Sequence, residues 1–481
     1  MEIKAIKKII ARYLPNHNKR IQEIKKAEKY YENRNDILNE KNPTDKDKKN
    51  SDGNPMRSAD NRVSHPWHQL LVDQKAAYSM TIPPTFDVED EDMNSEVEKL
   101  LGDSYAKVAK DLAVNAANAG ESWIHVWKDH EYENFFRYAV VDSKQIIAIY
   151  DKKLNEKLKG ILRVYDDFLD NGDEVVVYEY WNDKECHMFS RPKDASDDDL
   201  VENNTIQIID KSTGEVVETT NNFEHDWPGY VPFVRFSNNP LRQSDLQKYK
   251  KLIDVYDKVY SGFINDLDDV QEIIYVLTNY GGEDKQEFLN DLKRFKMVQL
   301  EADKDEPGGI ETLAIEIPVE ARTKMLEITR EAIFTHGQGV DPQKNIGQNN
   351  SGVALKHMYS LLELKVSMLE TEFRQGFAEL VRFILFYFDS DPDVSIKQTW
   401  TRTAINDDLE KADVISKLAP VTSQETIAKQ NPLVEDWQQE IEQQQKEADD
   451  EMRAIDDYRD KEAEEDLKNR IGEDDGEEED E

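Results

Sequence analysis

Cysteine is almost absent from this sequence, because Cys186 is the single cysteine among 481 residues. No intrachain disulfide can form, and cysteine-based metal sites such as paired CxxC motifs are excluded. A chain without disulfides fits a reducing compartment. Long hydrophobic runs are missing as well: the most apolar stretch, Leu380–Phe388, is far shorter than the ~20 residues of a membrane-spanning helix. The sequence therefore predicts a protein without disulfides or a membrane span.

Basic residues are scarce relative to acidic ones. The chain has 62 Lys and Arg against 101 Asp and Glu, which gives a formal net charge of −39 at pH 7. Nucleic-acid-binding surfaces use Lys and Arg to neutralise phosphates, so this chain is not expected to wrap nucleic acid with its general surface. An acidic wall can still surround DNA without gripping it, because like charges repel the duplex.

Common catalytic motifs are also missing, since the chain contains no GxSxG, Walker A or GxGxxG pattern. Neighbouring carboxylates are frequent, but they lie in polar runs where nothing would raise a pKa for acid–base work. In "SHPWH", His65 and His68 flank Trp67, either as half of a metal site or as a loop anchored by the tryptophan; we favour the loop. His225 is interpreted as a turn residue. The sequence predicts no catalytic residue, cofactor or metal site.

The first half of the chain changes from helical to strand-like patterning. Residues 1–60 are expected to form an amphipathic helix, whose isoleucines pack in a core rather than on a membrane surface, followed by a polar linker. Residues 61–241 begin with helices, of which the last is expected to end at Gly120. From residue 122 to 236, β-branched and aromatic runs alternate with turn signals. This pattern predicts an antiparallel β meander and an α+β fold class.

The second half is mainly helical. Pro318 stands where a first-turn proline is tolerated, and Gly337 just past the end of the same helix. Gly376 interrupts a longer helix and favours a bend there. The predicted segments are, in order, a helix at 242–270, a small mixed segment at 271–317, a helix at 318–336, a polar loop at 337–352, a long helix and a returning strand at 353–405, helices at 406–445, and an acidic, largely disordered tail at 446–481.

This order of elements resembles the portal proteins of tailed bacteriophages, of the SPP1-like type found in siphophages of Gram-positive hosts. Three stretches carry the resemblance: "NRVSHPWHQLLVDQKAAYSM" at 61–80, "GYVPFVRFSNN" at 229–239 and "NNSGVALKHMYSLLELK" at 349–365. None of them is catalytic, so their specificity lies in their co-occurrence and order. The match covers about residues 1–445 and leaves out the acidic tail.

The resemblance implies a portal fold assembled as a homo-oligomeric ring, usually of twelve subunits, at one vertex of the capsid. Double-stranded DNA passes through its channel without sequence specificity, packaged by the terminase large subunit and later ejected. Residues 61–241 correspond to the wing, the helices at 242–270 and 318–336 to the stem, 271–317 to the clip, and 406–445 to the crown. Further partners are a head-completion or adaptor protein, the scaffold and the major capsid protein. Such a protein belongs to the virion and is assembled in the host cytoplasm, with no cofactor and no membrane.

The loop at 337–352 corresponds to the tunnel loop, which projects into the channel. Glycines such as Gly337 and Gly339 permit backbone conformations that other residues avoid, and Asn and Gln can bond to phosphate without the strength of a charge. Lys344 is the lone cation in "GQGVDPQKNIGQNNSG" and would repeat around a ring as one positive band. An ordinary surface connection is the alternative, although the loop is longer than typical helix–helix connections. The residues expected to face DNA are Gln338, Lys344, Asn345, Gln348, Asn349 and Asn350.

The stem and the clip supply two further sets of candidate residues. The helix at 242–270 has more apolar positions than one facing helix needs, so part of its surface is expected to pack against neighbouring subunits. The clip is expected to dock the terminase and the adaptor. The candidates are Tyr256, Val259, Tyr260 and Phe263 for subunit packing, and Glu301, Asp303, Asp305 and Glu306 for docking.

Two other classes of protein remain open at this point. One is a different oligomeric capsid or connector protein, which a micrograph would separate from a portal because a portal gives a ring with a central hole. The other is an acidic metal-dependent nuclease, which incubation with plasmid and Mg²⁺ or Mn²⁺ would reveal.

Overall fold

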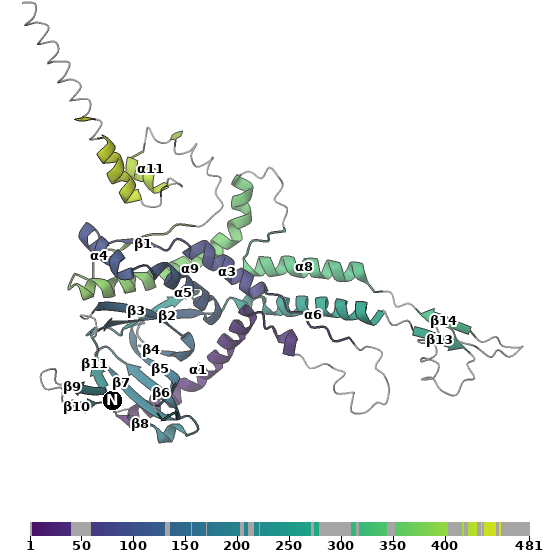
Figure 1. The fold of residues 1–481 in the computed structure, drawn as a ribbon, viewed down its shortest axis with the longest axis horizontal. Coiled ribbons are helices and arrows are strands. Elements are labelled where there is room, and N and C mark those ends of the chain that lie inside the picture. The colour runs from purple at the N-terminus through teal and green to yellow at the C-terminus, as the bar shows by residue number, and fades with distance from the viewer. Residues whose placement is uncertain are drawn as a thin grey trace, which may run out of the picture. The chain divides into compact units, whose positions relative to one another are not determined.

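A computed structural model gives the fold (Figure 1). The described residues are 2–39, 59–129, 135–154, 156–169, 171–202, 206–209, 216–220, 222–270, 274–278, 309–313, 317–343, 352–402, 416–417, 422–430, 434, 437–448 and 452–453. The chain divides into two units, Met1–Asn345 with Met358–Thr403, and Ile346–His357 with Ala404–Glu481. In the second unit the described residues include α11 (Gln424–Gln430) and a helix at 437–448, as the sequence predicts for part of 406–445. Of the tail predicted at 446–481, residues 446–448 belong to this helix and 452–453 are also described, while 449–451 and 454–481 lie outside the described residues.

The N-terminal helix α1 (Ile3–Tyr31) packs its apolar face on the rest of the first unit. Ile6 and Ile10 are buried in a cluster with strand residues such as Leu162. Ala27 and Tyr30 enter a second cluster, near the other end of the helix. The prediction that these isoleucines serve a core is therefore confirmed. A short 3-10 helix, η1 (Asp36–Asn39), follows.

The strands form antiparallel pairs throughout, but in several sheets rather than one meander. After β3 the chain passes from one sheet to the next through a turn at η2 (Ser143–Gln145). In this turn Ser143 Oγ donates to the Glu121 carbonyl at 2.7 Å. A three-stranded sheet has the order β12 (Phe233–Ser237), β2 (Glu121–Asp129) and β3 (Phe135–Val141). A six-stranded sheet has the order β11 (Asn222–Glu224), β7 (Glu185–Pro192), β6 (Glu174–Trp181), β5 (Leu158–Phe168) and β4 (Ile146–Tyr150), with β8 (Val201–Glu202) on β7 after η3 (Asp197–Asp199). The strands β9 (Ile206–Ile209) and β10 (Val216–Thr220) form a separate pair.

Helices cover the three-stranded sheet and form the largest core. They are α3 (Trp67–Met80), α4 (Glu91–Leu101), α5 (Tyr105–Ala119) and α9 (Gly352–Tyr387). The end of α5 is the left-handed residue Gly120, with φ of 85°, as predicted for a cap. Its missing side chain is also required by space, because a Cβ there would lie 2.1 Å from the Arg242 carbonyl oxygen.

The long helix α9 packs directly on β12. The rings of Phe373 and Phe377 lie 5.2 and 4.9 Å from that of Phe236. A Cβ on Gly376 would lie 2.7 Å from the Phe236 ring, so this glycine serves close helix–strand approach. The predicted bend at Gly376 stays a prediction, since α9 is continuous in its helical assignment. The returning strand is shorter than predicted: β15 (Lys397–Thr399) pairs with β1 (Thr85–Asp87).

A helical hairpin extends the first unit (Figure 1). It consists of α6 (Leu246–Val270) and α8 (Val319–Gly337), which lie side by side, with the antiparallel strands β13 (Ile274–Thr278) and β14 (Gly309–Leu313) between them in the chain. Two predicted bounds need correction. The helix expected from 242 starts at Leu246, because Arg242 has a φ of 54° and residues 239–245 form a polar turn. Gly337 is the last residue of α8, and Gln338 is the left-handed cap, with φ of 53°.

Candidate functional site

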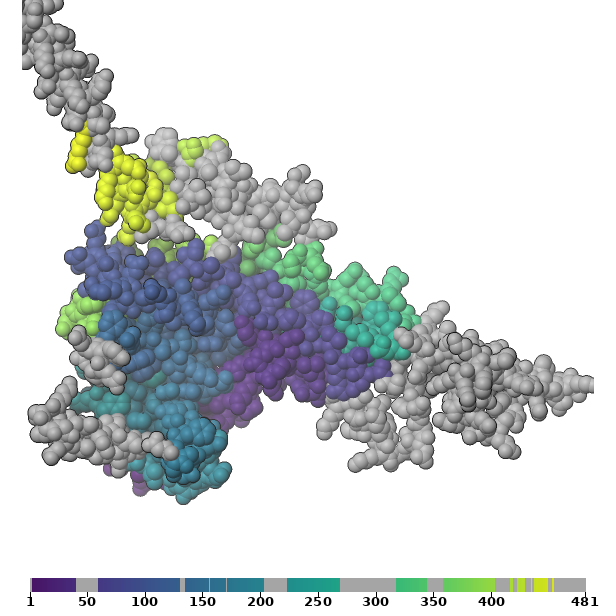
Figure 2. Space-filling model, in the orientation of Figure 1, coloured from purple at the N-terminus to yellow at the C-terminus, as the bar shows by residue number. Residues whose placement is uncertain are grey.

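The segment before α3 runs along α6, and Figure 2 shows the early part of the chain, in purple and indigo, against the teal atoms of the helical hairpin. Three of its backbone N–H groups donate to side chains of α6: Asn61 to Asn265 Oδ1 at 2.6 Å, Val63 to Ser261 Oγ at 3.0 Å and His65 to Asp257 Oδ1 at 3.1 Å. The spacing matches because four helical residues rise about 6.0 Å and two extended residues about 6.6 Å. Polar residues at four-residue intervals therefore bind the segment along the length of the hairpin.

Aromatic side chains complete this attachment. The Trp67 ring lies 5.2 Å from that of Tyr256 on α6 and 5.6 Å from that of Phe334 on α8, in edge-to-face arrangements. The His65 ring lies 4.8 Å from Tyr256 and 4.7 Å from Tyr260, and its Nδ1 is 2.7 Å from Asp257 Oδ1. Among the described residues, no group of three His, Cys, Asp or Glu side chains could hold a metal ion. Trp67 anchors this segment as predicted, but Trp67 and His68 themselves belong to α3, so the loop is limited to residues 64–66.

His68 directly follows Trp67 on α3, and its side chain is buried between α5 and α6. Its Nδ1 is 2.7 Å from the Tyr249 hydroxyl and its Nε2 is 2.9 Å from Asn118 Oδ1. Asn118 Oδ1 can only accept, so Nε2 carries the proton and Nδ1 accepts from the tyrosine. Burial lowers the pKa of His68 to about 4, and the imidazole is therefore neutral at pH 7.

We expect His68 to make the fold sensitive to acid. Its pKa is about 4 in the folded chain and 6.5 when unperturbed, so between these values the unfolded chain binds a proton that the folded chain does not. The corresponding stability is present above pH 6.5 and falls by about 3 kcal/mol as the pH approaches 4. Thermal melts of the protein and of His68→Gln should show a stability gap that narrows from pH 7.5 to 4.5. A gap of constant size would contradict the assignment of a buried neutral histidine.

Apolar residues recur at four-residue intervals along α6 and form a ridge. Other residues of the same chain cover this ridge only in part. The ridge is Val255, Val259, Phe263 and Leu267; Val259 and Phe263 are half-buried, while Val255 and Leu267 are 38% and 47% exposed. On α8, Met325 and Ile328 are 44% and 53% exposed. Residues four apart form one ridge of a helix surface, which is the unit of helix–helix packing.

The structure separates the four predicted stem residues into two faces. Tyr256 and Tyr260 contact His65 of their own chain, so their rings already have partners. Val259 and Phe263 lie on the ridge, where Arg322 of α8 lies over the Phe263 ring at 5.8 Å and pairs with Asp266. Val255 and Leu267 were not predicted, although their four-residue spacing from Val259 and Phe263 is a signal that could identify them.

Two buried lysines meet one aspartate where α6 begins. Lys75 of α3 and Lys365 of α9 lie 3.1 and 3.2 Å from Asp245 Oδ2, and Asn238 donates to the other oxygen at 2.9 Å. Burial by itself would raise the pKa of Asp245, but the charges of Lys365 and Lys75 outweigh it and hold that pKa far below its usual range. Burial lowers the pKa of Lys75 to about 8. We call this set the lysine–aspartate cluster.

The cluster reaches the base of the loop that follows α8. Lys365 Nζ also donates to the Gly337 carbonyl at 3.0 Å. Gly337 and Gly339 were expected to supply unusual backbone conformations, but neither has a positive φ. They are required by space instead, since a Cβ at either position would lie 2.5 or 2.3 Å from the Leu71 side chain. The left-handed residue is Gln338, which is the single described residue among those predicted to face DNA.

The remaining predicted site residues lie outside the described residues. They are Lys344, Asn345, Gln348, Asn349 and Asn350 of the loop, and Glu301, Asp303, Asp305 and Glu306 of the clip.

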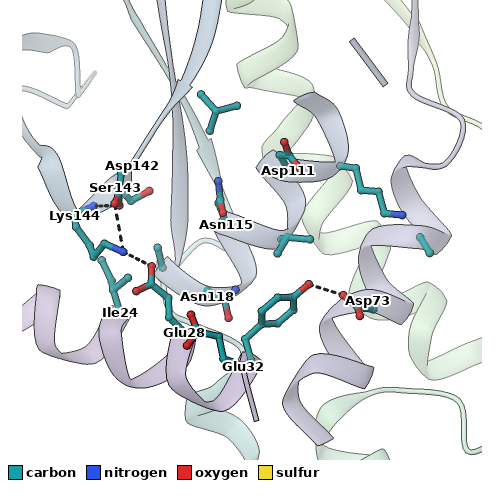
Figure 3. A pocket seen from close by; sticks show the side chains of 16 residues that line it. Ile24, Glu28, Glu32, Asp73, Asp111, Asn115, Asn118, Asp142, Ser143 and Lys144 are labelled. Carbon is teal, nitrogen blue, oxygen red and sulfur yellow. Dashed lines mark hydrogen bonds and ion pairs between the residues drawn. The ribbon is translucent and has the colours of Figure 1, made fainter. Parts of the chain in front are cut away.

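A groove of about 900 Å³ opens between α1, α3 and α5 (Figure 3). Five carboxylates and two lysines are among its lining residues, and several of them bond to one another. Lys144 pairs with Glu28 and with Asp142, the latter at 3.3 Å, and Asp73 accepts from the Tyr31 hydroxyl at 2.8 Å. These contacts tie α1 to the turn at η2 and to α3, so the groove has a structural explanation.

The described architecture is an α+β body with a long helical hairpin and a longer helix that returns a strand to the body, and comparison of the sequence with known families assigns it to the phage portal class. A family model described as "Phage portal protein, SPP1 Gp6-like" matches residues 10–454, and the chain belongs to this family. It is 39% identical over 449 residues to the portal protein of Clostridium phage phiCD119, covering 91% of this chain and 94% of that one. It is 31% identical over 392 residues to the portal protein of Bacillus phage SPP1, covering 79% and 75%.

Among solved structures, the chain is similar to a chain of the neck of a native GTA particle computed with C12 symmetry. The TM-score is 0.41 and the identity 12%, over 77% of this chain and 90% of that chain. The family and the two sequence relatives give this chain the general function of portal proteins, a DNA conduit at one vertex of the capsid, and make it a component of the virion. The family is structural rather than catalytic.

None of the described helices combines the length and the apolar character that a membrane span needs.

Proposed function

We propose that this chain forms a closed ring, of twelve copies as in the family it resembles, in which the apolar ridge of α6 and the exposed apolar residues of α8 lie between neighbouring subunits. The observation that carries the proposal is the ridge itself. Val255 and Leu267 are large apolar side chains left open to solvent on a chain with a net charge of −39 and a mean hydropathy of −0.80. A head-to-tail contact of one such surface with a different one generates a ring when the rotation closes.

The loop at 337–352 is proposed to face the DNA in the channel of this ring. Gln338, Lys344, Asn345, Gln348, Asn349 and Asn350 are the candidates for contact with the duplex. Their chemistry supports the proposal, because amides bond weakly to phosphate and a single lysine per subunit adds little salt-dependent affinity. A conduit benefits from weak contacts, since strong ones would slow the passage of DNA.

The partners of the ring are proposed from family membership alone. They are the terminase large subunit, a head-completion or adaptor protein, the scaffold and the major capsid protein, with assembly in the host cytoplasm. The clip carboxylates Glu301, Asp303, Asp305 and Glu306 are proposed to contact the terminase and the adaptor. We further propose that the chain is not an enzyme.

Electron microscopy of the purified protein tests the central claim. Negative-stain images should show rings with a central hole, and native mass spectrometry should give one closed stoichiometry near twelve. A monomer at micromolar concentration, or an open filament, would contradict the ring. Incubation with supercoiled plasmid and Mg²⁺ or Mn²⁺ should leave the plasmid intact, and nicking by the purified ring would instead favour the nuclease alternative.

A further inference from the structure

We propose that Gln74 and Lys365 are positioning residues that hold the base of the DNA-facing loop, where the chain leaves the end of α8. The inference rests on the proposed function of residues 337–352. It adds two side chains that lie far from the loop in the sequence, one on α3 and one on α9.

Gln74 binds the main chain of Val340 with both ends of its amide. The Val340 N–H donates to Gln74 Oε1 at 3.0 Å, and Gln74 Nε2 donates to the Val340 carbonyl at 2.8 Å. An amide side chain has both an acceptor and a donor, so it pairs with one residue of main chain as a neighbouring strand would. A Cβ on Gly339 would lie 2.8 Å from Gln74 Oε1, and its absence leaves room for the pair.

The residues on either side of Val340 are held as well. The Gly339 N–H donates to the Phe334 carbonyl at 3.0 Å, which continues the end of α8, and Asp341 pairs with Arg330 on that helix. Gly339 and Asp341 are therefore bonded to α8, and Val340 is bonded to α3. The direction in which the chain leaves the hairpin is set by these contacts.

Lys365, which lies on α9 after the loop, binds the end of α8. Its ammonium group bonds the carbonyl of Gly337 at the C-terminus of α8, where the partial negative charge of a helix favours a cation. The same group lies 3.2 Å from Asp245, which Lys75 of α3 also contacts at 3.1 Å. The helices before and after the loop are therefore bound to each other and to the start of α6 through the lysine–aspartate cluster.

Gln74 sets the path of the main chain at the base of the loop and does not stabilise the hydrophobic core. Gln74 contributes hydrogen bonds to one main-chain residue, and each such bond adds little net stability compared with the buried apolar clusters nearby. Moving DNA exerts a force on a loop that contacts it. The hydrogen bonds at the base of the loop transmit this force to α3 and α8. Loss of the base should therefore impair the passage or retention of DNA before it impairs folding.

Gln74→Ala is the decisive variant, with Gln69→Ala as its matched control, because Gln69 is an exposed glutamine of the same helix. In hydrogen exchange on intact rings, we expect the Val340 amide to exchange about fivefold faster or more in Gln74→Ala, since its acceptor is gone. Gln74→Glu keeps the acceptor and loses the donor, so it should give an intermediate value. The Gly339 amide, which bonds to Phe334, and the melting temperature should stay as they are.

The same variants are then assembled into procapsids. We expect normal incorporation of rings but fewer DNA-filled particles, in the order Gln69→Ala, Gln74→Glu, Gln74→Ala. Lys365→Met, which keeps the length of the side chain and removes its donors, should also reduce filling, but with a lower melting temperature, because the buried Asp245 then keeps a single lysine. An unchanged Val340 amide in Gln74→Ala would overturn the inference, and so would normal filling in a variant whose amide is released. Failure of the proposed function is distinguishable, because it is read from substitutions at Lys344 and Gly347 that leave these anchors intact.

Discussion

Leu267→Asp and Phe263→Asp are expected to abolish rings while leaving soluble protein. Both residues lie on the apolar ridge of α6, and Leu267 is 47% exposed in the single chain, so an aspartate there disturbs little within the subunit. In a ring, each carboxylate would be buried without a partner at every subunit contact, and each burial costs several kcal/mol. Val259→Asp, one turn earlier on the ridge, should have the same effect. Native mass spectrometry and size-exclusion chromatography measure the loss.

Gln247→Asp provides the control for this series. It adds the same single charge to the same helix, at an exposed polar position near the beginning of α6. We expect Gln247→Asp to assemble normally, with an unchanged melting temperature. Intact rings in both Leu267→Asp and Phe263→Asp would place the ridge outside the subunit interface. Insoluble protein in Phe263→Asp alone would be explained by its half-buried ring, which is why Leu267→Asp is the sharper test.

The helical elements of the hairpin could be predicted closely because periodicity over long segments is a strong signal. The predicted helices at 242–270 and 318–336 correspond to Leu246–Val270 and Val319–Gly337. The difference at the first end has a tertiary cause. Asp245 turns its side chain into the buried lysine–aspartate cluster, and Lys75 and Lys365 come from distant parts of the chain. The residues next to Asp245 in the sequence give no indication of this contact.

The strands were predicted by type but not by arrangement. Alternating β-branched residues indicate strands, yet they do not state where one sheet ends and the next begins. At the turn after β3, Ser143 donates to the Glu121 carbonyl, a contact between residues 22 apart that the local strand pattern does not reveal. A sequence read without such pairings gives one continuous meander.

The glycines of the loop base show a second limit of sequence reasoning. A glycine predicts either a special backbone conformation or a close approach, and sequence cannot tell which. At Gly337 and Gly339 the reason is the nearby Leu71 side chain, whereas the left-handed conformation falls on Gln338. Gln74 could not be identified at all, because a glutamine in the middle of a helix has no distinguishing pattern. Its role depends on the position of Val340, far away in the chain.

Substitutions in the loop itself should separate assembly from DNA transport. Lys344→Glu would replace a band of positive charge around the ring with a negative one in a confined channel, where repulsion is poorly screened. Gly347→Pro fixes one φ angle and stiffens the loop. Neither position belongs to α6 or α8, and neither is one of the anchors Gln74 and Lys365. Both variants should form normal rings and enter procapsids, and then package little DNA or lose it after packaging.

Lys152→Glu is the matched control for the charge reversal, since Lys152 is exposed in a turn between strands of the six-stranded sheet. We expect particles with Lys152→Glu to fill normally. Normal titres of DNA-filled particles from both Lys344→Glu and Gly347→Pro would refute the tunnel assignment, because a loop that merely joins two helices on an outer surface tolerates both changes. Failure to form rings would instead place the loop between subunits. We expect packaging to fail with intact rings, because Val340 and Ile346 are the only large apolar residues in "GQGVDPQKNIGQNN", and Val340 is already bound to Gln74.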